Sequence, residues 1–133
     1  GGFHATRRAR VRIYVELLNG PANRARGWPP PVADFTSTNW HMFQIVLPEE
    51  KLTIKRAKVM ELLQAAGIGC QVHYPAIHLF ALYRKLGWKD GDYPLAEYAG
   101  RNILTIPLFP AMARPDVVRV VTALTGILKA HQK

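Results

Sequence analysis

The feature that most constrains how this chain folds is a change of hydrophobic period at Gly67. Ahead of it, apolar residues recur at helical spacing, at Val59, Met60, Leu62, Leu63 and Ala66. Glycine takes the left-handed conformation that ends a helix at little cost, so a helix is predicted to end at Gly67, with Ile68 folding back on Leu63. From Cys70 the period becomes two, which predicts a short strand up to Pro75, a residue that cannot donate to a ladder.

The predicted strand at 70–74 has two distinct faces. One face carries Cys70, Val72 and Tyr74, and the other carries Gln71 and His73. His73, Tyr74 and the nearby His78 therefore gather at the carboxyl end of a strand, where α/β proteins often bind ligands. A plainly packed or solvated role is the alternative for each histidine, and it weighs more for His78. A metal site is not expected, since the two histidines flank a proline and no carboxylate or second cysteine joins them.

Two further apolar segments, 42–47 and 103–107, also end at prolines and are predicted strands. Helical patterns cover residues 6–18, 53–66, 79–86 and 95–102, and the last helix opens at Pro115. This order predicts an α/β fold of the two-layer α+β kind. It would hold a small, three-stranded, mainly antiparallel sheet with helices packed on one face. The loop at 23–39 is long, but Trp28 and Phe35 indicate that parts of it pack.

Composition narrows the class of protein. The chain has 133 residues, of which 49% are hydrophobic, which suits one globular domain. The single cysteine, Cys70, fits the cytoplasm, and no apolar run is long enough to span a membrane. The net charge is +9, with the densest group at Arg7, Arg8, Arg10 and Arg12. Because no nucleic-acid-binding motif accompanies it, a solvated or inter-domain face is expected and nucleic acid is an unlikely partner.

Three motifs in order give a more specific indication. They are GIGCQVHYPAIHLFALYRKLG at 67–87, DYPLAEYAGRNILTIPLFPAM at 92–112, and a final helix. This arrangement resembles the C-terminal small domain of DegT/DnrJ-type sugar-nucleotide aminotransferases, which depend on pyridoxal phosphate and have fold type I. The resemblance runs from about Arg7 to Ile127. It departs from the family at Ala57, where an acidic residue often follows the arginine matched by Arg56.

The resemblance implies a single domain over 1–133, made of an inter-domain helix (1–20), a loop (21–40) and an α/β core (41–133). The parent enzyme would transfer an amino group from an amino acid, usually glutamate, to a nucleotide-linked keto sugar. It would act as a homodimer. The lysine that binds pyridoxal phosphate would lie in a large N-terminal domain upstream of this chain. No lysine here falls in a matching motif, so no catalytic residue is assigned. The isolated chain is expected to be inactive and to retain no cofactor.

The family pattern implies roles at the cleft wall for three residues. His73 and Tyr74 would lie at the mouth of the cofactor cleft, and His78 near the sugar-nucleotide. An apolar patch left by the absent domain is also expected, with Phe3, Trp28 and the open sheet face as its candidates. Two alternatives stay open at this point. A free-standing module binding an anionic ligand or a partner would be stabilised by phosphate, and a nucleic-acid binder would lose affinity steeply with salt.

Overall fold

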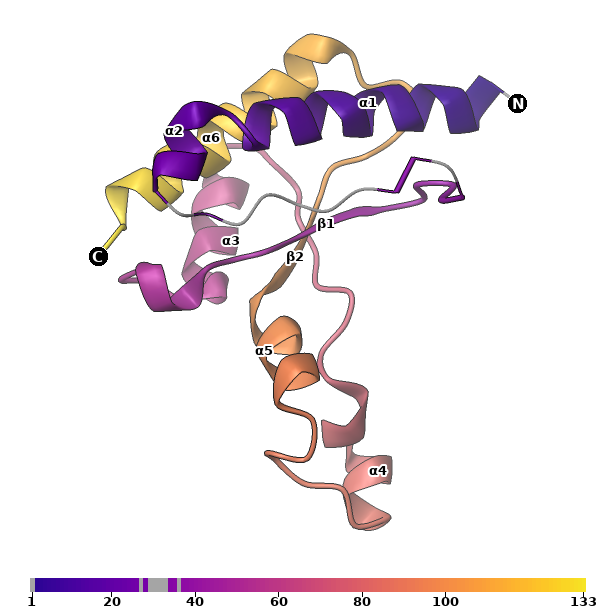
Figure 1. Cartoon of the computed structure of the whole chain (residues 1–133), viewed down its shortest axis with the longest axis vertical. Coiled ribbons are helices and arrows are strands. Elements are labelled where there is room, and N and C mark those ends of the chain that lie inside the picture. Colours follow the sequence, from indigo (N-terminus) through magenta and orange to yellow (C-terminus); the bar gives the residue numbers. More distant parts are fainter. Residues whose placement is uncertain (1, 27, 29–33, 36) are drawn as a thin grey trace.

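The structure is a computed structural model that describes residues 2–26, 28, 34–35 and 37–133 (Figure 1). The helices are α1 (Gly2–Leu18), α2 (Pro21–Ala25), α3 (Arg56–Ala65), α4 (Ala81–Lys85), α5 (Pro94–Asn102) and α6 (Arg114–Ala130). Two 3-10 turns, η1 (Glu49–Lys51) and η2 (Ile77–Leu79), and two strands, β1 (Phe43–Val46) and β2 (Ile103–Ile106), complete the order. Most of these elements lie close to the ranges that hydrophobic period predicts.

The two strands form an antiparallel pair whose register separates an apolar face from a polar one. Phe43 lies opposite Ile106 and Ile45 opposite Leu104, whereas Gln44 lies opposite Thr105. Because side chains alternate along a strand, the first two pairs share one face and the third lies on the other. Phe43, Leu104 and Ile106 are buried in the core. The opposite face carries the polar pair Gln44 and Thr105 at one end and the apolar pair Val46 and Ile103 at the other. We call the Gln44–Thr105 end the polar face.

The predicted third strand at 70–74 is not formed, so the expectation of a three-stranded sheet is wrong. Gln71 makes one isolated bridge to Thr105, with N–H···O distances of 3.1 and 2.8 Å. The next antiparallel pairing would join His73 to Ile103. The His73 carbonyl, however, accepts from the Gln44 side chain, and the Ile103 carbonyl accepts from Arg56.

In the other direction along the same register, the pairing would reach Pro107, which has no N–H to donate. Its carbonyl accepts the Tyr14 hydroxyl at 2.8 Å. The ladder is thus blocked at both ends of the single bridge, by a proline on one side and by side-chain hydrogen bonds on the other.

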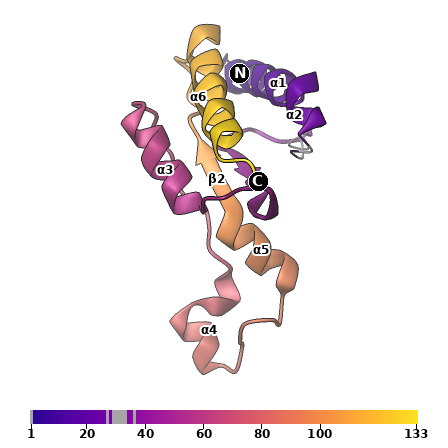
Figure 2. The same ribbon diagram turned by 90° about the vertical axis from the view of Figure 1, so that its left-hand side faces the viewer.

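The core lies between the sheet and the three long helices. Helices α1 and α6 run side by side, and α3 packs on α6 (Figures 1 and 2). Tyr14 of α1 stacks on Phe43 of β1 with ring centroids 5.3 Å apart. The predicted helix end at Gly67 is confirmed, because Gly67 has φ of +72° and the Ile68 N–H bonds the Leu63 carbonyl at 2.9 Å.

The described residues of the segment at 21–40 include a short helix and packed aromatic side chains. The segment begins with α2, and Trp28 is buried at 7% exposure. Phe35 packs against Trp40, with the Arg12 guanidinium 4.5 Å from its ring centroid. The packing expected of Trp28 and Phe35 is therefore confirmed, and burial removes Trp28 from the candidates for an exposed patch. Residues 29–33 and the Phe3 side chain lie outside the described residues.

The exposed apolar surface instead gathers on residues 74–98, which we call the arm. The arm carries η2, α4 and most of α5, and it projects away from the packed body (Figures 1 and 2). Thirteen large hydrophobic side chains are exposed in the described part of the chain. All but Val46, Phe109 and Val118 belong to the arm, among them Leu82 at 65%, Leu86 at 70% and Leu95 at 87% exposure. Such a concentration is typical of an interaction surface.

Candidate functional site

The polar face of the sheet brings together four side chains at the point where the arm begins. Gln44, Thr105 and Gln71 stand in a row across β1, β2 and the isolated bridge. The Nδ1 atom of His73 lies 2.9 Å from the Thr105 hydroxyl, and Gln44 donates to the His73 carbonyl. The contact between Nδ1 and the Thr105 hydroxyl holds the His73 ring in place. Its Nε2 makes no hydrogen bond to the described residues, so it is available to a ligand.

Tyr74 follows at the edge of this cluster. Its ring meets the His73 ring edge-on, with centroids 5.1 Å apart and an interplanar angle of 82°, and its side chain is 63% exposed. A hollow of about 350 Å³ lies beside the cluster, and it is lined by His41, Met42, Gly69, Cys70, Gln71, His73, Thr105, Ile106, Pro107 and Leu108. The His73 and Tyr74 rings thus lie together in a segment that forms no strand, and their place at the mouth of a cofactor cleft stays a prediction.

His78 lies apart from that cluster, inside the arm. It is 8% exposed, and its Nε2 is 3.0 Å from the Glu97 carboxylate. Its ring meets Tyr93 edge-on at 5.0 Å. The structure therefore gives His78 the packed environment weighed as the alternative above. Its proximity to a sugar-nucleotide stays a prediction.

Arg56 of α3 holds the carboxyl end of α5 and the start of β2. Its Nη1 donates to the Gly100 carbonyl at 2.6 Å and to the Ile103 carbonyl at 3.2 Å. It thereby satisfies carbonyls at the carboxyl end of α5, where a cation also complements the helix dipole. Burial lowers the pKa of this guanidinium. With backbone carbonyls as partners, Arg56 needs no acidic neighbour at Ala57.

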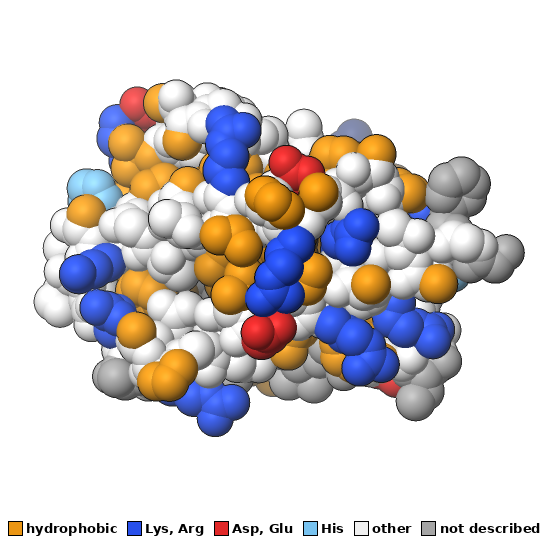
Figure 3. All heavy atoms as spheres, turned by 90° about the horizontal axis from the view of Figure 1, so that it is seen from above, with side chains coloured by type: hydrophobic (Ala, Val, Ile, Leu, Met, Phe, Trp, Pro, Cys, Tyr) orange, Lys and Arg blue, Asp and Glu red, His pale blue; other side chains and the backbone are white. Residues whose placement is uncertain are grey.

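The arginines of α1 are largely used in contacts with the body. Arg7 donates to the Asn39 carbonyl at 3.4 Å, and Arg10 donates to the Met112 carbonyl. Seen over the α1 and α6 side, Lys and Arg side chains are spread among hydrophobic ones and do not form one patch (Figure 3). This face therefore lacks the continuous basic patch that is expected of a nucleic-acid surface.

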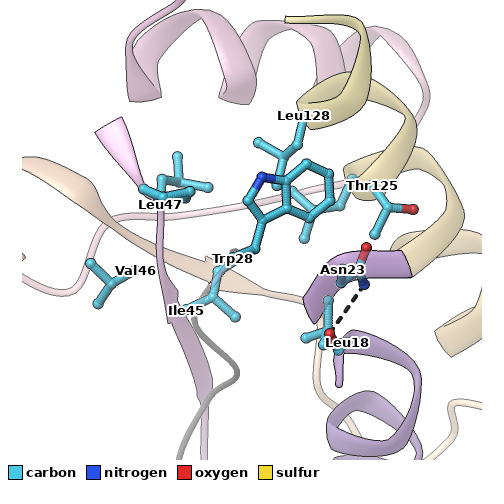
Figure 4. Close-up of a pocket in the computed structure, with 10 residues that line it drawn as sticks. Leu18, Asn23, Trp28, Ile45, Val46, Leu47, Thr125 and Leu128 are labelled. Atoms are coloured by element: carbon cyan, nitrogen blue, oxygen red, sulfur yellow. Dashed lines mark hydrogen bonds between the residues drawn. The ribbon is translucent and has the colours of Figure 1, made fainter. Parts of the chain in front are cut away.

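A second cavity lies where α2 meets α6, and it is too small for a substrate. Its volume is about 30 Å³, and Trp28 covers it together with Leu47 and Leu128 (Figure 4). The Asn23 amide there donates to the Leu18 carbonyl at 3.1 Å. A cavity of this size holds about one or two waters. It is a packing feature, and the hollow beside His73 remains the candidate site.

Comparison with known proteins places the chain. Residues 2–125 match the DegT/DnrJ/EryC1/StrS aminotransferase family. The chain belongs to this family. The uncharacterized protein MJ1066 of Methanocaldococcus jannaschii is 33% identical over 104 residues, which are 77% of this chain and 27% of that protein.

Solved structures of aminotransferases share the fold. DesV of S. venezuelae, solved in complex with a ketimine intermediate, is 27% identical with a TM-score of 0.76, covering 96% of this chain and 32% of DesV. The PLP form of Spr1654 from Streptococcus pneumoniae is 23% identical with a TM-score of 0.80, over 96% of this chain and 32% of Spr1654. This member of the family therefore spans about a third of the length of those relatives.

The hollow does not fit pyridoxal phosphate as a complete site. That cofactor needs a lysine for its aldehyde and an acidic partner for its pyridine nitrogen. No lysine or carboxylate lines the hollow in the described part of the chain. The same described residues hold no group of three His, Cys, Asp or Glu placed to bind a metal, and no helix among them is long and apolar enough to cross a membrane.

Sequence reasoning missed three residues of this region. Gln44 and Thr105 complete the polar face, but their proximity to His73 depends on strand register. Glu97 ends the Pro-Leu-Ala-Glu run of the motif at 92–112 and is buried, with 6% of its surface exposed. An acidic residue in the first turn of a helix is ordinary, so its burial against His78 had no local signal.

Proposed function

We propose that this chain is the C-terminal small domain of a sugar-nucleotide aminotransferase. The intact enzyme would act in the cytoplasm, moving an amino group from an amino acid, with glutamate the expected donor, to a nucleotide-linked keto sugar. The observation that carries the proposal is the family match over 2–125 together with the His73–Tyr74 cluster on the open sheet face. Pyridoxal phosphate would be bound mainly by a large domain outside this chain.

In this proposal the chain supplies one wall of the cleft. The Thr105 contact orients His73 so that Nε2 can hold a polar group of the substrate or a water molecule. Tyr74 offers an exposed phenol beside it. Neither imidazole nor phenol forms a stable imine with an aldehyde, so neither replaces the missing lysine.

The first experiment tests whether the chain is a part or a whole. The purified chain, mixed with pyridoxal phosphate and dialysed, should be colourless and should move no amino group from glutamate to a keto sugar. Borohydride trapping should scatter any label over several surface lysines. A single stoichiometric label with a stable visible absorbance band would contradict the proposal.

The second experiment tests the wall residues. A chimera of DesV in which residues 2–133 of this chain replace the matching third should bind the cofactor and transaminate. In it, His73→Ala should raise KM up to about tenfold, the scale of one lost hydrogen bond. His4→Ala, an exposed histidine on α1, is the matched control. An active chimera indifferent to His73→Ala would show that His73 is not part of the wall.

We further propose that the arm docks on the large domain or on the partner subunit of a homodimer. Its exposed apolar side chains support this, because a monomer rarely leaves so many uncovered. The isolated chain should bind a hydrophobic dye and self-associate in sedimentation experiments. A strictly monomeric chain at high concentration that binds no dye would count against the docking role.

A further inference from the structure

The arm has a polar centre in place of an apolar core. Within residues 74–98 the buried residues are Ala76, His78 and Glu97, and every residue from 81 to 96 is exposed. Hydrophobic burial therefore does little to fix the shape of this segment. Segments of this kind open at low free-energy cost unless specific contacts hold them.

Those contacts converge on Glu97. One carboxylate oxygen, Oε1, accepts from the Gly91 N–H at 2.8 Å and the Tyr93 N–H at 3.4 Å, and lies 3.0 Å from His78 Nε2. The other oxygen is 3.8 Å from Arg101 Nη1. Glu97 thus ties η2, the turn before α5 and α5 itself to one charged group, and such charge-assisted bonds are stronger than neutral ones.

Helix α5, which carries Glu97, also packs against the backbone at the start of the arm. Gly100 lies one turn after Glu97, and its backbone approaches so closely that an added Cβ would stand 2.5 Å from the Ala76 nitrogen. Arg56 holds the Gly100 carbonyl from the body side. Residues of α5 therefore contact the start of the arm at two points, the Pro75–Ala76 peptide and His78.

We propose that Glu97 is a positioning residue of the arm. Through His78, Gly91 and Tyr93 it holds the arm in one shape, and this sets the course of the chain after Tyr74 and the apolar surface that the arm presents. The proposal goes beyond the proposed function, because it concerns the order of the arm and would hold whatever reaction the intact protein performs.

Trp88 provides a local reporter. It is 41% exposed and its ring centroid is 5.3 Å from that of Tyr93, whereas Trp28 and Trp40 are 7% and 8% exposed in the body. Glu97→Ala should raise amide hydrogen exchange at 77–93 on the order of tenfold or more, the scale of one lost charge-assisted bond. Acrylamide quenching of Trp88 should rise with it, while exchange in β1, β2 and α6 stays unchanged.

Two variants make the comparison specific. Glu97→Gln should keep much of the protection, because its amide oxygen still accepts from Gly91 and Tyr93. Glu61→Ala is the matched control, since Glu61 is an exposed carboxylate of α3 bound to Lys58 at 2.6 Å. If Glu97→Ala does not fold, His78→Leu removes one partner only and should raise exchange over the same residues by a smaller factor.

The pH dependence of Trp88 quenching tests whether Glu97 holds the arm through its negative charge or only through packing. The hydrogen bond from His78, followed by those from Gly91 and Tyr93, lowers the pKa of Glu97. Its contribution is thus present above the unfolded value of about 4.3 and is lost as pH falls through the lower folded value. The ionisable side chains in contact with it are His78 and Arg101, and the Arg84–Asp90 pair lies in the same arm.

Trp88 quenching in the wild-type chain should therefore rise as the solution is acidified below about pH 4.3. Glu97→Gln should show a smaller rise, because the Arg84–Asp90 pair of the arm still loses its carboxylate in acid. Unchanged exchange at 77–93 in Glu97→Ala would overturn the proposal. A uniform rise that includes β1, β2 and α6, or identical pH profiles for the wild type and Glu97→Gln, would overturn it too.

Discussion

Replacing Gly100 with alanine tests the close contact between α5 and the start of the arm. The new Cβ would lie 2.5 Å from the Ala76 nitrogen, 3.2 Å from the Pro75 carbonyl carbon and 3.3 Å from the Ala76 Cα. Ordinary carbon contacts lie at about 3.5–4.0 Å, so the two backbones must separate by roughly 1 Å. Neither backbone is free to move, since Arg56 holds Gly100 and the Ala76 carbonyl accepts from Leu79 at 3.0 Å.

The expected loss follows from two opposing effects. Overpacking costs about 1–3 kcal/mol, and alanine recovers up to about 1 kcal/mol of helix propensity. We expect a net loss of about 1–2 kcal/mol in the free energy of unfolding. For a chain of this size that lowers Tm by roughly 3–8 °C. Urea denaturation and a thermal scan measure it, and hydrogen exchange shows whether the arm loosens first.

Gly126→Ala is the matched control. Gly126 lies inside α6, and an added Cβ there meets nothing within 4 Å. The same substitution should therefore stabilise the chain by about 1 kcal/mol. The reasoning fails if Gly100→Ala leaves both stability and arm exchange unchanged, or if the two variants lose stability equally.

Two further substitutions test the body. Tyr14→Phe removes the hydrogen bond to Pro107 and should cost about 1 kcal/mol at neutral pH. Burial, with a smaller effect of Asp116, raises the pKa of Tyr14, so the unfolded phenol ionises first and stability falls as pH rises above about 10. Alkaline urea titrations should show a shallower fall in Tyr14→Phe, and equal slopes would contradict this assignment. Arg56→Met leaves the carbonyls of Gly100 and Ile103 without their donor, and should lower the free energy of unfolding by about 1.5–3 kcal/mol in urea titrations. A loss below about 0.5 kcal/mol would show that water replaces the guanidinium.

The sequence by itself determined the local elements of this protein. The apolar period before Gly67 predicts α3, and the glycine's freedom at positive φ explains where the helix ends. The motifs at 67–87 and 92–112 indicated the family, because their order and spacing can be read from the sequence alone. Each of these inferences depends on residues that are close together in the chain.

The tertiary structure decided whether the segment at 70–74 pairs as a strand, because that pairing depends on residues far away in the sequence. The segment at 70–74 has the pattern of a strand, yet its pairing is stopped by Pro107 and by side chains from Gln44 and Arg56, tens of residues away. Periodicity assigns a residue to a face but does not say which distant group competes for its backbone.

The same limit explains the arm. From its sequence alone, the arm would be expected to bury its apolar side chains. In the structure these side chains are exposed, and the buried centre of the arm is formed by His78 and Glu97. A buried carboxylate is tolerated where several donors reach it at once. That convergence of Gly91, Tyr93 and His78 on one oxygen exists only in the folded chain.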